Sequence, residues 1–170
     1  AMLMATVRAT IHAVAQQIHP GRALQLAERA LRIDLESSDS FVTLFHARLD
    51  AATRTLTFVD CGHGHVFLRR ADGTAEELLP RGLPLGVPNR ERHQEGSITF
   101  AAGDALVLYS DGLIDAQPEL GLDRFMLAGR IGAATSAREM VEILTAIPTL
   151  AGAPPDDLTV LVVRCKEPTP

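Results

Sequence analysis

The 170-residue sequence predicts an α+β fold, in which helices and strands occupy separate stretches of the chain. Three observations support this prediction. Apolar residues at helical spacing mark both the N-terminal part and the C-terminal part, β-branched and aromatic residues dominate the middle, and an apolar strand comes last. Such segregated runs are typical of mostly antiparallel sheets covered by helices, rather than of a doubly wound parallel sheet.

The N-terminal part shows two helical patterns. Residues 2–18 carry one apolar stripe that begins with Leu3, Val7 and Ile11. No Ser, Thr, Asp or Asn precedes this stripe, so its start lacks a capping residue. We expect Pro20-Gly21 to end this helix and a second helix to cover about residues 22–35.

The middle of the chain predicts a series of strands. A turn at residues 50–54 joins the first two strands into a hairpin, and Asp72-Gly73 indicates another turn. Residues 82–88 contain Gly and Pro at several positions and predict a loop. The expected strands cover residues 41–49, 55–59, 65–70, 76–79, 93–100 and 104–109.

The C-terminal part returns to helical spacing. We expect a short helix near residues 123–130 and a longer one from Ser136, where Glu139 completes a capping box. A buried strand over 158–163 follows. We therefore expect one domain over residues 1–164 and a frayed tail over residues 165–170.

Composition excludes several classes of protein. Lys and Arg number 16 and Asp and Glu number 21, so the net charge of -5 argues against nucleic-acid binding. No stretch of about 18 apolar residues is present, so we expect no membrane span, and the N-terminus does not resemble a signal peptide. Two cysteines, Cys61 and Cys165, are too few for a disulfide scaffold and indicate free thiols in the cytoplasm.

Two acidic sites at strand ends are the main candidates for chemistry. Asp111 follows an apolar strand and precedes Gly112, which we expect to let the chain turn sharply. Asp156 and Asp157 precede the last strand, where alternation lets only one of them face a given site. Each motif alone also reads as an ordinary turn. If the two strand ends converge, however, their carboxylates form an oxygen-rich site for Mg²⁺ or Mn²⁺, which can activate water against a phosphate ester.

A second candidate is the segment Cys61-Gly62-His63-Gly64-His65. A thiol and two histidines suggest a zinc site, but the sequence offers no evident fourth ligand. The alternative is that the two glycines shape a tight turn between strands. Motifs for phosphate-binding loops and for a nucleophilic serine are absent from the sequence.

Six motifs in order give a resemblance to a known family. Taken together, they resemble the SpoIIE-like serine phosphatases, which are bacterial members of the type 2C (PPM) superfamily of metal-dependent protein phosphatases. The match covers about residues 1–164. The motifs are Phe41–Phe45, Asp50 with Thr53 and Leu56, Gly62-His63, Gly82–Gly86, Gly103-Asp104 with Leu108–Gly112, and Asp156-Asp157 with Thr159.

The resemblance implies a four-layer αββα sandwich with two Mn²⁺ or Mg²⁺ ions at one edge. It implies that a metal-bound water, rather than a side chain, is the nucleophile. Asp111 and Asp156 then correspond to metal ligands, and Asp157 to a supporting residue beside them. Gly112 belongs to the same Ser-Asp-Gly motif, and Gly86 would shape a loop beside the site.

The resemblance also implies a substrate and reveals one departure. Typical substrates are anti-anti-sigma proteins that carry phosphoserine or phosphothreonine. A sensor domain often controls the phosphatase. The family's Asp-x-x-Gly motif, whose Asp bridges the metals, does not occur in these 170 residues. We therefore expect an N-terminally truncated domain with weak activity on its own, whose open strand edges favour a homodimer. The alternative is a non-catalytic module of the same fold for dimerisation or docking.

Overall fold

The structure, a computed structural model, describes residues 2–15, 19–88, 93–115, 118–149 and 157–166. The chain forms two compact units: unit 1 holds residues 1–64 and 79–99, and unit 2 holds residues 65–78 and 100–170. The elements in order are α1 (Met2–Ala15), α2 (Pro20–Ser37), β1 (Leu44–Asp50), β2 (Thr55–Cys61), β3 (Val66–Arg69), β4 (Ala75–Glu77), β5 (Arg81–Gly82), β6 (Gly96–Thr99), β7 (Ala105–Tyr109), α3 (Gly112–Asp115), the 3₁₀ turn η1 (Pro118–Leu120), α4 (Arg124–Arg130), α5 (Ala137–Thr149) and β8 (Val160–Arg164).

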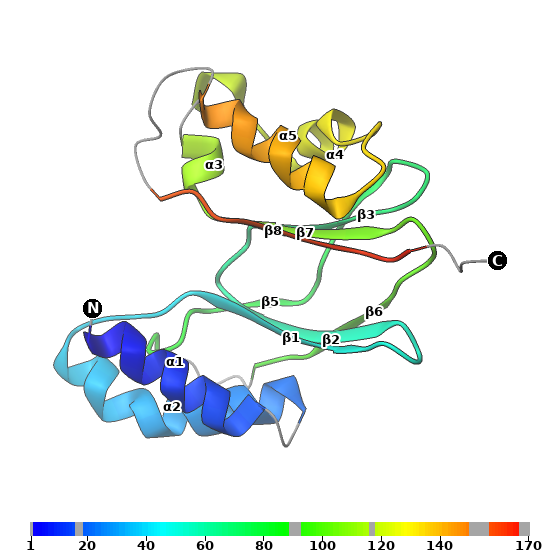
Figure 1. The fold of residues 1–170 in the computed structure, drawn as a ribbon. Coiled ribbons are helices and arrows are strands. Elements are labelled where there is room, and N and C mark those ends of the chain that lie inside the picture. Colours follow the sequence, from blue (N-terminus) through cyan, green and yellow to red (C-terminus); the bar gives the residue numbers. More distant parts are fainter. Residues whose placement is uncertain (1, 16–18, 89–92, 116–117, 150–156, 167–170) are drawn as a thin grey trace. The chain divides into compact units, whose positions relative to one another are not determined.

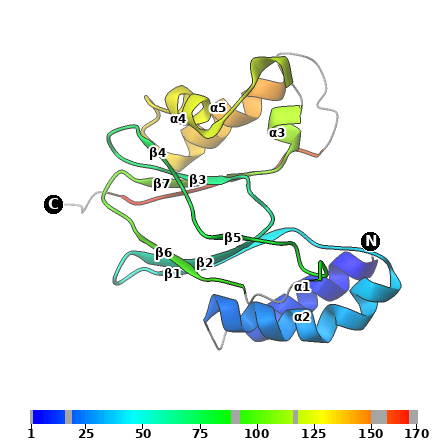
Figure 2. The same cartoon turned by 180° about the vertical axis from the view of Figure 1, so that it is seen from behind.

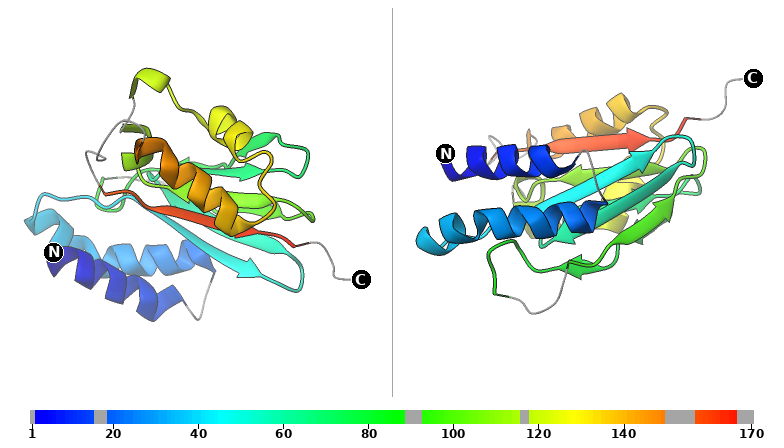
Figure 3. Two further views of the ribbon diagram at one scale, coloured as in Figure 1. Left: turned by 45° about the horizontal axis from the view of Figure 1, so that its top comes forward. Right: turned by 90° about the horizontal axis from the view of Figure 1, so that it is seen from below.

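Unit 1 is a sheet with two helices on one face (Figures 1 and 3). Strand β2 lies at its centre, antiparallel to β1 and β6 and parallel to the short β5. The expected hairpin is confirmed, because Asp50 pairs with Thr55 across the turn. Burial of one face of α2 against the sheet stabilises the unit. Its buried core consists of Val7, Leu24, Leu31, Leu35, Val42, Val59, Cys61 and Leu85.

The start of α2 differs from the prediction. We expected Pro20-Gly21 to end a helix, but Pro20 is the first residue of α2. Proline is tolerated there because the first-turn N–H groups have no intrahelical acceptor. The Gly21 N–H instead donates to Glu95 Oε1 at 2.7 Å, so a side chain 74 residues away satisfies the helix start.

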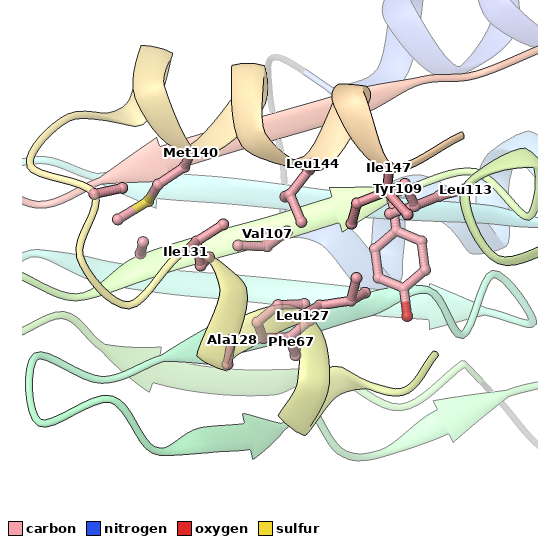
Figure 4. Close-up of a cluster of buried hydrophobic side chains, with 12 residues drawn as sticks. Phe67, Val107, Tyr109, Leu113, Leu127, Ala128, Ile131, Met140, Leu144 and Ile147 are labelled. Atoms are coloured by element: carbon pink, nitrogen blue, oxygen red, sulfur yellow. The ribbon is translucent and has the colours of Figure 1, made fainter. Parts of the chain in front are cut away.

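Unit 2 is an antiparallel sheet in the order β4-β3-β7-β8, covered on one face by α3, α4 and α5 (Figure 2). Figure 4 shows side chains of α4 and α5 directed at β3 and β7. The buried cluster includes Phe67 and Val107 from the strands, Leu127 from α4, and Met140 and Leu144 from α5. Each of these five side chains is 0% exposed, so this layer is a packed hydrophobic core.

The helix starts of unit 2 follow the sequence signals. Asp123 caps α4, because its Oδ1 accepts from the Met126 N–H at 2.9 Å. Ser136 precedes α5, and its Oγ accepts from the Glu139 N–H at 3.2 Å, as the capping box predicts. The return bond differs slightly, since the Glu139 carboxylate accepts from the Thr135 N–H at 2.7 Å.

A buried carboxylate fixes the start of β7. Asp104 is 1% exposed and accepts from the N–H groups of Ala71 and Ala101, each at 2.9 Å. Arg70 Nη1 donates to the same carboxylate at 2.8 Å. The main chain of Asp104 also takes part, because the Cys165 N–H donates to the Asp104 carbonyl at 2.8 Å. This cluster therefore joins the β3–β4 turn to the ends of β7 and β8.

Candidate metal centre

The candidate site lies where β7 ends and β8 begins. The two strands are antiparallel, and their register ends with Tyr109 opposite Val160. The residues that follow Tyr109 therefore lie beside the residues that precede Val160. This topology brings Asp111 and Asp157 to the same edge of one sheet, as the sequence suggested for converging strand ends.

Ser110 joins the two strand ends through three hydrogen bonds. Its N–H donates to the Thr159 carbonyl at 2.9 Å. Its hydroxyl accepts from the Thr159 N–H at 2.9 Å and donates to the Asp157 carbonyl at 3.0 Å. The sequence analysis assigned Ser110 no role of its own. Its contacts depend on which strand pairs with β7, which the sequence does not reveal.

Asp111 directly precedes the short helix α3. Its carbonyl accepts from the N–H groups of Ile114 and Asp115, each at 2.9 Å, and its Oδ1 accepts from the Gly112 N–H at 3.0 Å. The Asp111 side chain is exposed, whereas Leu113 is fully buried and anchors α3 in the core of unit 2 (Figure 4). Thus a rigid core positions a carboxylate that faces solvent.

The role expected for Gly112 needs a correction. We expected the freedom of glycine to let the chain turn sharply at Gly112, but Gly112 is the first residue of α3 and is not among the glycines with positive φ. The direction of the chain changes because a helix starts after Asp111. Gly112 is buried beneath this helix start.

The second acidic pair is placed only in part. Asp157 is exposed and directly precedes the segment that leads into β8. Asp156, the expected ligand, lies outside the described residues. The structure therefore brings Asp111 and Asp157 to one sheet edge, while the ligand role of Asp156 stays a prediction.

Gly86 lies in unit 1, in the loop after β5. Its φ is +91°, and a Cβ there would lie 2.9 Å from the Ser40 carbonyl oxygen and 3.3 Å from the Leu35 side chain. Glycine is therefore required by both conformation and space. The expectation that this loop lies beside the metal site stays a prediction.

The segment Cys61–His65 forms the expected turn. Gly62 and Gly64 both have φ of +72°, and the Asp60 carboxylate accepts from the His63 N–H at 2.8 Å and from the Gly64 N–H at 3.2 Å. His65 belongs to unit 2, whereas Cys61 and His63 belong to unit 1. Within the described residues, no group of three His, Cys, Asp or Glu side chains is arranged to hold a metal ion.

Cys61 has a different partner, which the sequence did not indicate. Its Sγ lies 3.4 Å from His93 Nδ1, and His93 Nε2 lies 3.2 Å from Glu28 Oε2. Burial, with smaller effects of the Asp60 and Glu28 charges, raises the pKa of the Cys61 thiol to about 12. The thiol is therefore neutral at pH 7 and is a poor nucleophile.

The donor set at the sheet edge fits a hard divalent cation in kind. Asp111 and Asp157 supply carboxylate oxygens, the ligands that Mg²⁺ and Mn²⁺ prefer, and both side chains are exposed. Two carboxylates are too few to hold two ions. A complete centre therefore needs further oxygen ligands, for which Asp156 is the sequence-predicted candidate, while Asp157 keeps its predicted supporting role.

Comparisons with known structures define the class of the fold. The RsbU and RsbW domains of Rv1364c from Mycobacterium tuberculosis align with a TM-score of 0.80 at 21% identity, over 99% of this chain and 49% of that one. The PP2C phosphatase domain of SpoIIE from Bacillus subtilis, solved with a fragment of its regulatory domain, aligns with a TM-score of 0.79 at 22% identity, over 96% and 49%. RsbX in complex with magnesium gives 0.67 at 17% identity, over 95% and 71%. The fold is that of the PP2C phosphatases, as the sequence predicted.

Sequence comparison then identifies the family. The model of Stage II sporulation protein E (SpoIIE) matches residues 1–166, and the chain belongs to this family. Phosphoserine phosphatase RsbU of Bacillus subtilis is 30% identical over 155 residues, which cover 88% of this chain and 46% of RsbU. The chain thus spans less than half the length of this curated relative. Within the described residues, none of the helices is long and apolar enough to cross a membrane.

Proposed function

We propose that this chain is part of a metal-dependent protein serine/threonine phosphatase, with Asp111 and Asp156 as metal ligands and Asp157 as a supporting residue. The observation that carries the proposal is the junction of β7 and β8. There Ser110 binds both Thr159 and Asp157, so that two acidic strand ends meet at one sheet edge. Membership of the SpoIIE family supports this assignment.

The chemistry follows from the donors at this edge. Mn²⁺ or Mg²⁺, two ions in the intact site, would supply charge to bind the phosphate and would lower the pKa of a water, the proposed nucleophile. The chain's own residues would bind and orient: Asp111 presents a carboxylate from a helix start that Leu113 anchors in the core. No side chain needs to act as a nucleophile, which agrees with the neutral thiol of Cys61.

The proposed substrate is a phosphoserine or phosphothreonine residue of a regulatory protein in the cytoplasm, such as an anti-anti-sigma factor. The relative RsbU supports the phosphoserine part, since it is a phosphoserine phosphatase by name. We also propose a homodimer. In the described part of the chain, β1 and β8 each pair with a strand on one side alone, and such edges favour pairing with another chain. Sedimentation that shows a monomer at every concentration would contradict the dimer.

Two observations favour an alternative function. The described residues contain no group of three acidic or other metal-binding side chains, and the sequence contains no Asp-x-x-Gly motif. These 170 residues alone would then be weak as an enzyme. The alternative is that they form a non-catalytic module for dimerisation or protein docking.

A phosphatase assay distinguishes the two functions. A phosphoserine protein is incubated with the 170 residues, alone and joined to whatever sequence the gene encodes before Ala1, with and without Mn²⁺. The proposal expects Mn²⁺-dependent release of phosphate by the longer protein, lost in Asp111→Asn and retained in Glu142→Gln. Glu142 is an exposed acid on α5 and provides a matched change of charge. Absence of turnover in the longer protein would favour the docking module.

A further inference from the structure

We infer that Ser110 is a positioning residue of the proposed metal centre, and this inference rests on the proposed function. The Ser110 hydroxyl lies between two main-chain groups of the segment that leads into β8. It accepts from the Thr159 N–H at 2.9 Å and donates to the Asp157 carbonyl at 3.0 Å. One side chain thereby holds both ends of the segment from Asp157 to Thr159.

The covalent connection extends this effect to the other acid. Ser110 is bonded directly to Asp111, and the Ser110 N–H donates to the Thr159 carbonyl at 2.9 Å. The main chain at Asp111 and the main chain at Asp157 are therefore fixed relative to each other through one residue. A metal site requires this kind of control, because its ligands must converge within narrow limits of distance.

The chemistry of the position favours a hydroxyl. A serine hydroxyl can donate one hydrogen bond and accept others at the same atom, and both functions are used here. Alanine can provide neither bond. Threonine retains the hydroxyl and is compatible with a position at the end of a strand.

The location of these bonds indicates that their main effect is on geometry rather than on stability. The β7–β8 register covers five residue pairs, from Ala105 opposite Arg164 to Tyr109 opposite Val160, and Ser110 lies beyond its last pair. Both hydroxyl bonds are solvent-exposed, so water can replace them at small cost when they are lost. The strands would remain paired without the hydroxyl, while the acidic ends would lose their fixed separation.

Two measurements on the longer protein of the phosphatase assay test the inference, with four variants beside the wild type. Ser110→Ala removes the hydroxyl and Ser110→Thr retains it. Ser136→Ala is the matched control, because the Ser136 hydroxyl also accepts a main-chain N–H in unit 2 but caps α5. The first measurement is hydrogen exchange of the Thr159 amide without metal. The second is Mn²⁺ binding, followed by electron paramagnetic resonance, with Asp111→Asn as the reference for a lost ligand.

The expected result is a selective loss. Ser110→Ala should expose the Thr159 amide to exchange and weaken Mn²⁺ binding about 10-fold, as for other residues that orient metal ligands. Ser110→Thr should restore both properties, and Ser136→Ala should change neither.

Contrary outcomes separate the role of Ser110 from the proposed metal centre. If Asp111→Asn abolishes Mn²⁺ binding while Ser110→Ala binds as tightly as the wild type, the role of Ser110 is wrong and the proposed metal centre stands. An unprotected Thr159 amide in the wild type would also overturn the role of Ser110. If the wild type binds no Mn²⁺, or if Asp111→Asn binds it normally, the proposed metal centre fails and this inference fails with it.

Discussion

The buried carboxylate of Asp104 gives the sharpest prediction for stability. It is 1% exposed and accepts hydrogen bonds from two main-chain N–H groups and from Arg70. The change Asp104→Asn preserves the size of the side chain but replaces one acceptor oxygen with an NH₂ group. Whichever way the amide turns, at least one N–H or guanidinium donor then faces another donor.

The magnitude follows from the loss of these contacts. A bond to a charged acceptor is worth about 1.5–3 kcal/mol, and a buried N–H left without an acceptor costs about 1–3 kcal/mol. Arg70 contributes less, because its side chain is 30% exposed and water can solvate it. We expect the free energy of unfolding to fall by about 3 kcal/mol. For a chain of this size, that loss corresponds to a decrease in Tm of about 6–12 °C.

Thermal unfolding followed by circular dichroism measures this effect. Asp72→Asn is the control, because Asp72 is exposed and asparagine can still accept the Thr74 N–H in the same turn. The control should shift Tm by no more than about 2 °C, which corresponds to about 0.5 kcal/mol. A shift for Asp104→Asn as small as that of the control would refute the reasoning, because the buried donors would then have found other acceptors.

Three further predictions follow from single residues. Because burial raises the pKa of the Cys61 thiol to about 12, a disulfide reagent should label Cys165 alone in the native protein; rapid labelling of two thiols would contradict this. Burial lowers the pKa of His46 below its ordinary 6.5, so protonation opposes folding. The free energy of unfolding should therefore fall as the pH drops below 6.5. Urea titrations at pH 7.5 and 5.5 should show a smaller fall in His46→Gln. Gly86→Ala should destabilise the protein by about 2 kcal/mol in chemical denaturation, because it combines positive φ with a clash. Gly73→Ala has the same φ of +91° but open space, so it should cost only about 1 kcal/mol; equal costs would remove the clash from the explanation.

Much of the fold follows from local signals in the sequence. The spacing of Leu3, Val7 and Ile11 predicts α1, and Asp72-Gly73 predicts the turn between β3 and β4, because each signal acts within a few residues. The boundaries are less well predicted. Pro20 can either end a helix or begin one, and only the packing of α2 decides which.

The candidate site was predictable in composition but not in detail. Acidic residues at the ends of apolar strands suggested convergence, and the pairing of β7 with β8 brings Asp111 and Asp157 to one edge. The role of Ser110 and the contact of Cys61 with His93 join residues 32 or more positions apart. Such contacts depend on tertiary structure, so no local motif marks them.

The order of synthesis gives the two-unit division a practical consequence. Unit 1 ends at residue 99, but unit 2 begins with β3 and needs β8, which ends at Arg164. A ribosome that adds about 5–20 residues per second needs roughly 3–13 s for the 65 residues between these points (164 − 99 = 65). Until β8 is complete, the apolar side chains of β3, including Phe67, lack part of the core that β7, α4, α5 and β8 supply. The nascent chain therefore passes through a period in which chaperone binding or aggregation competes with folding.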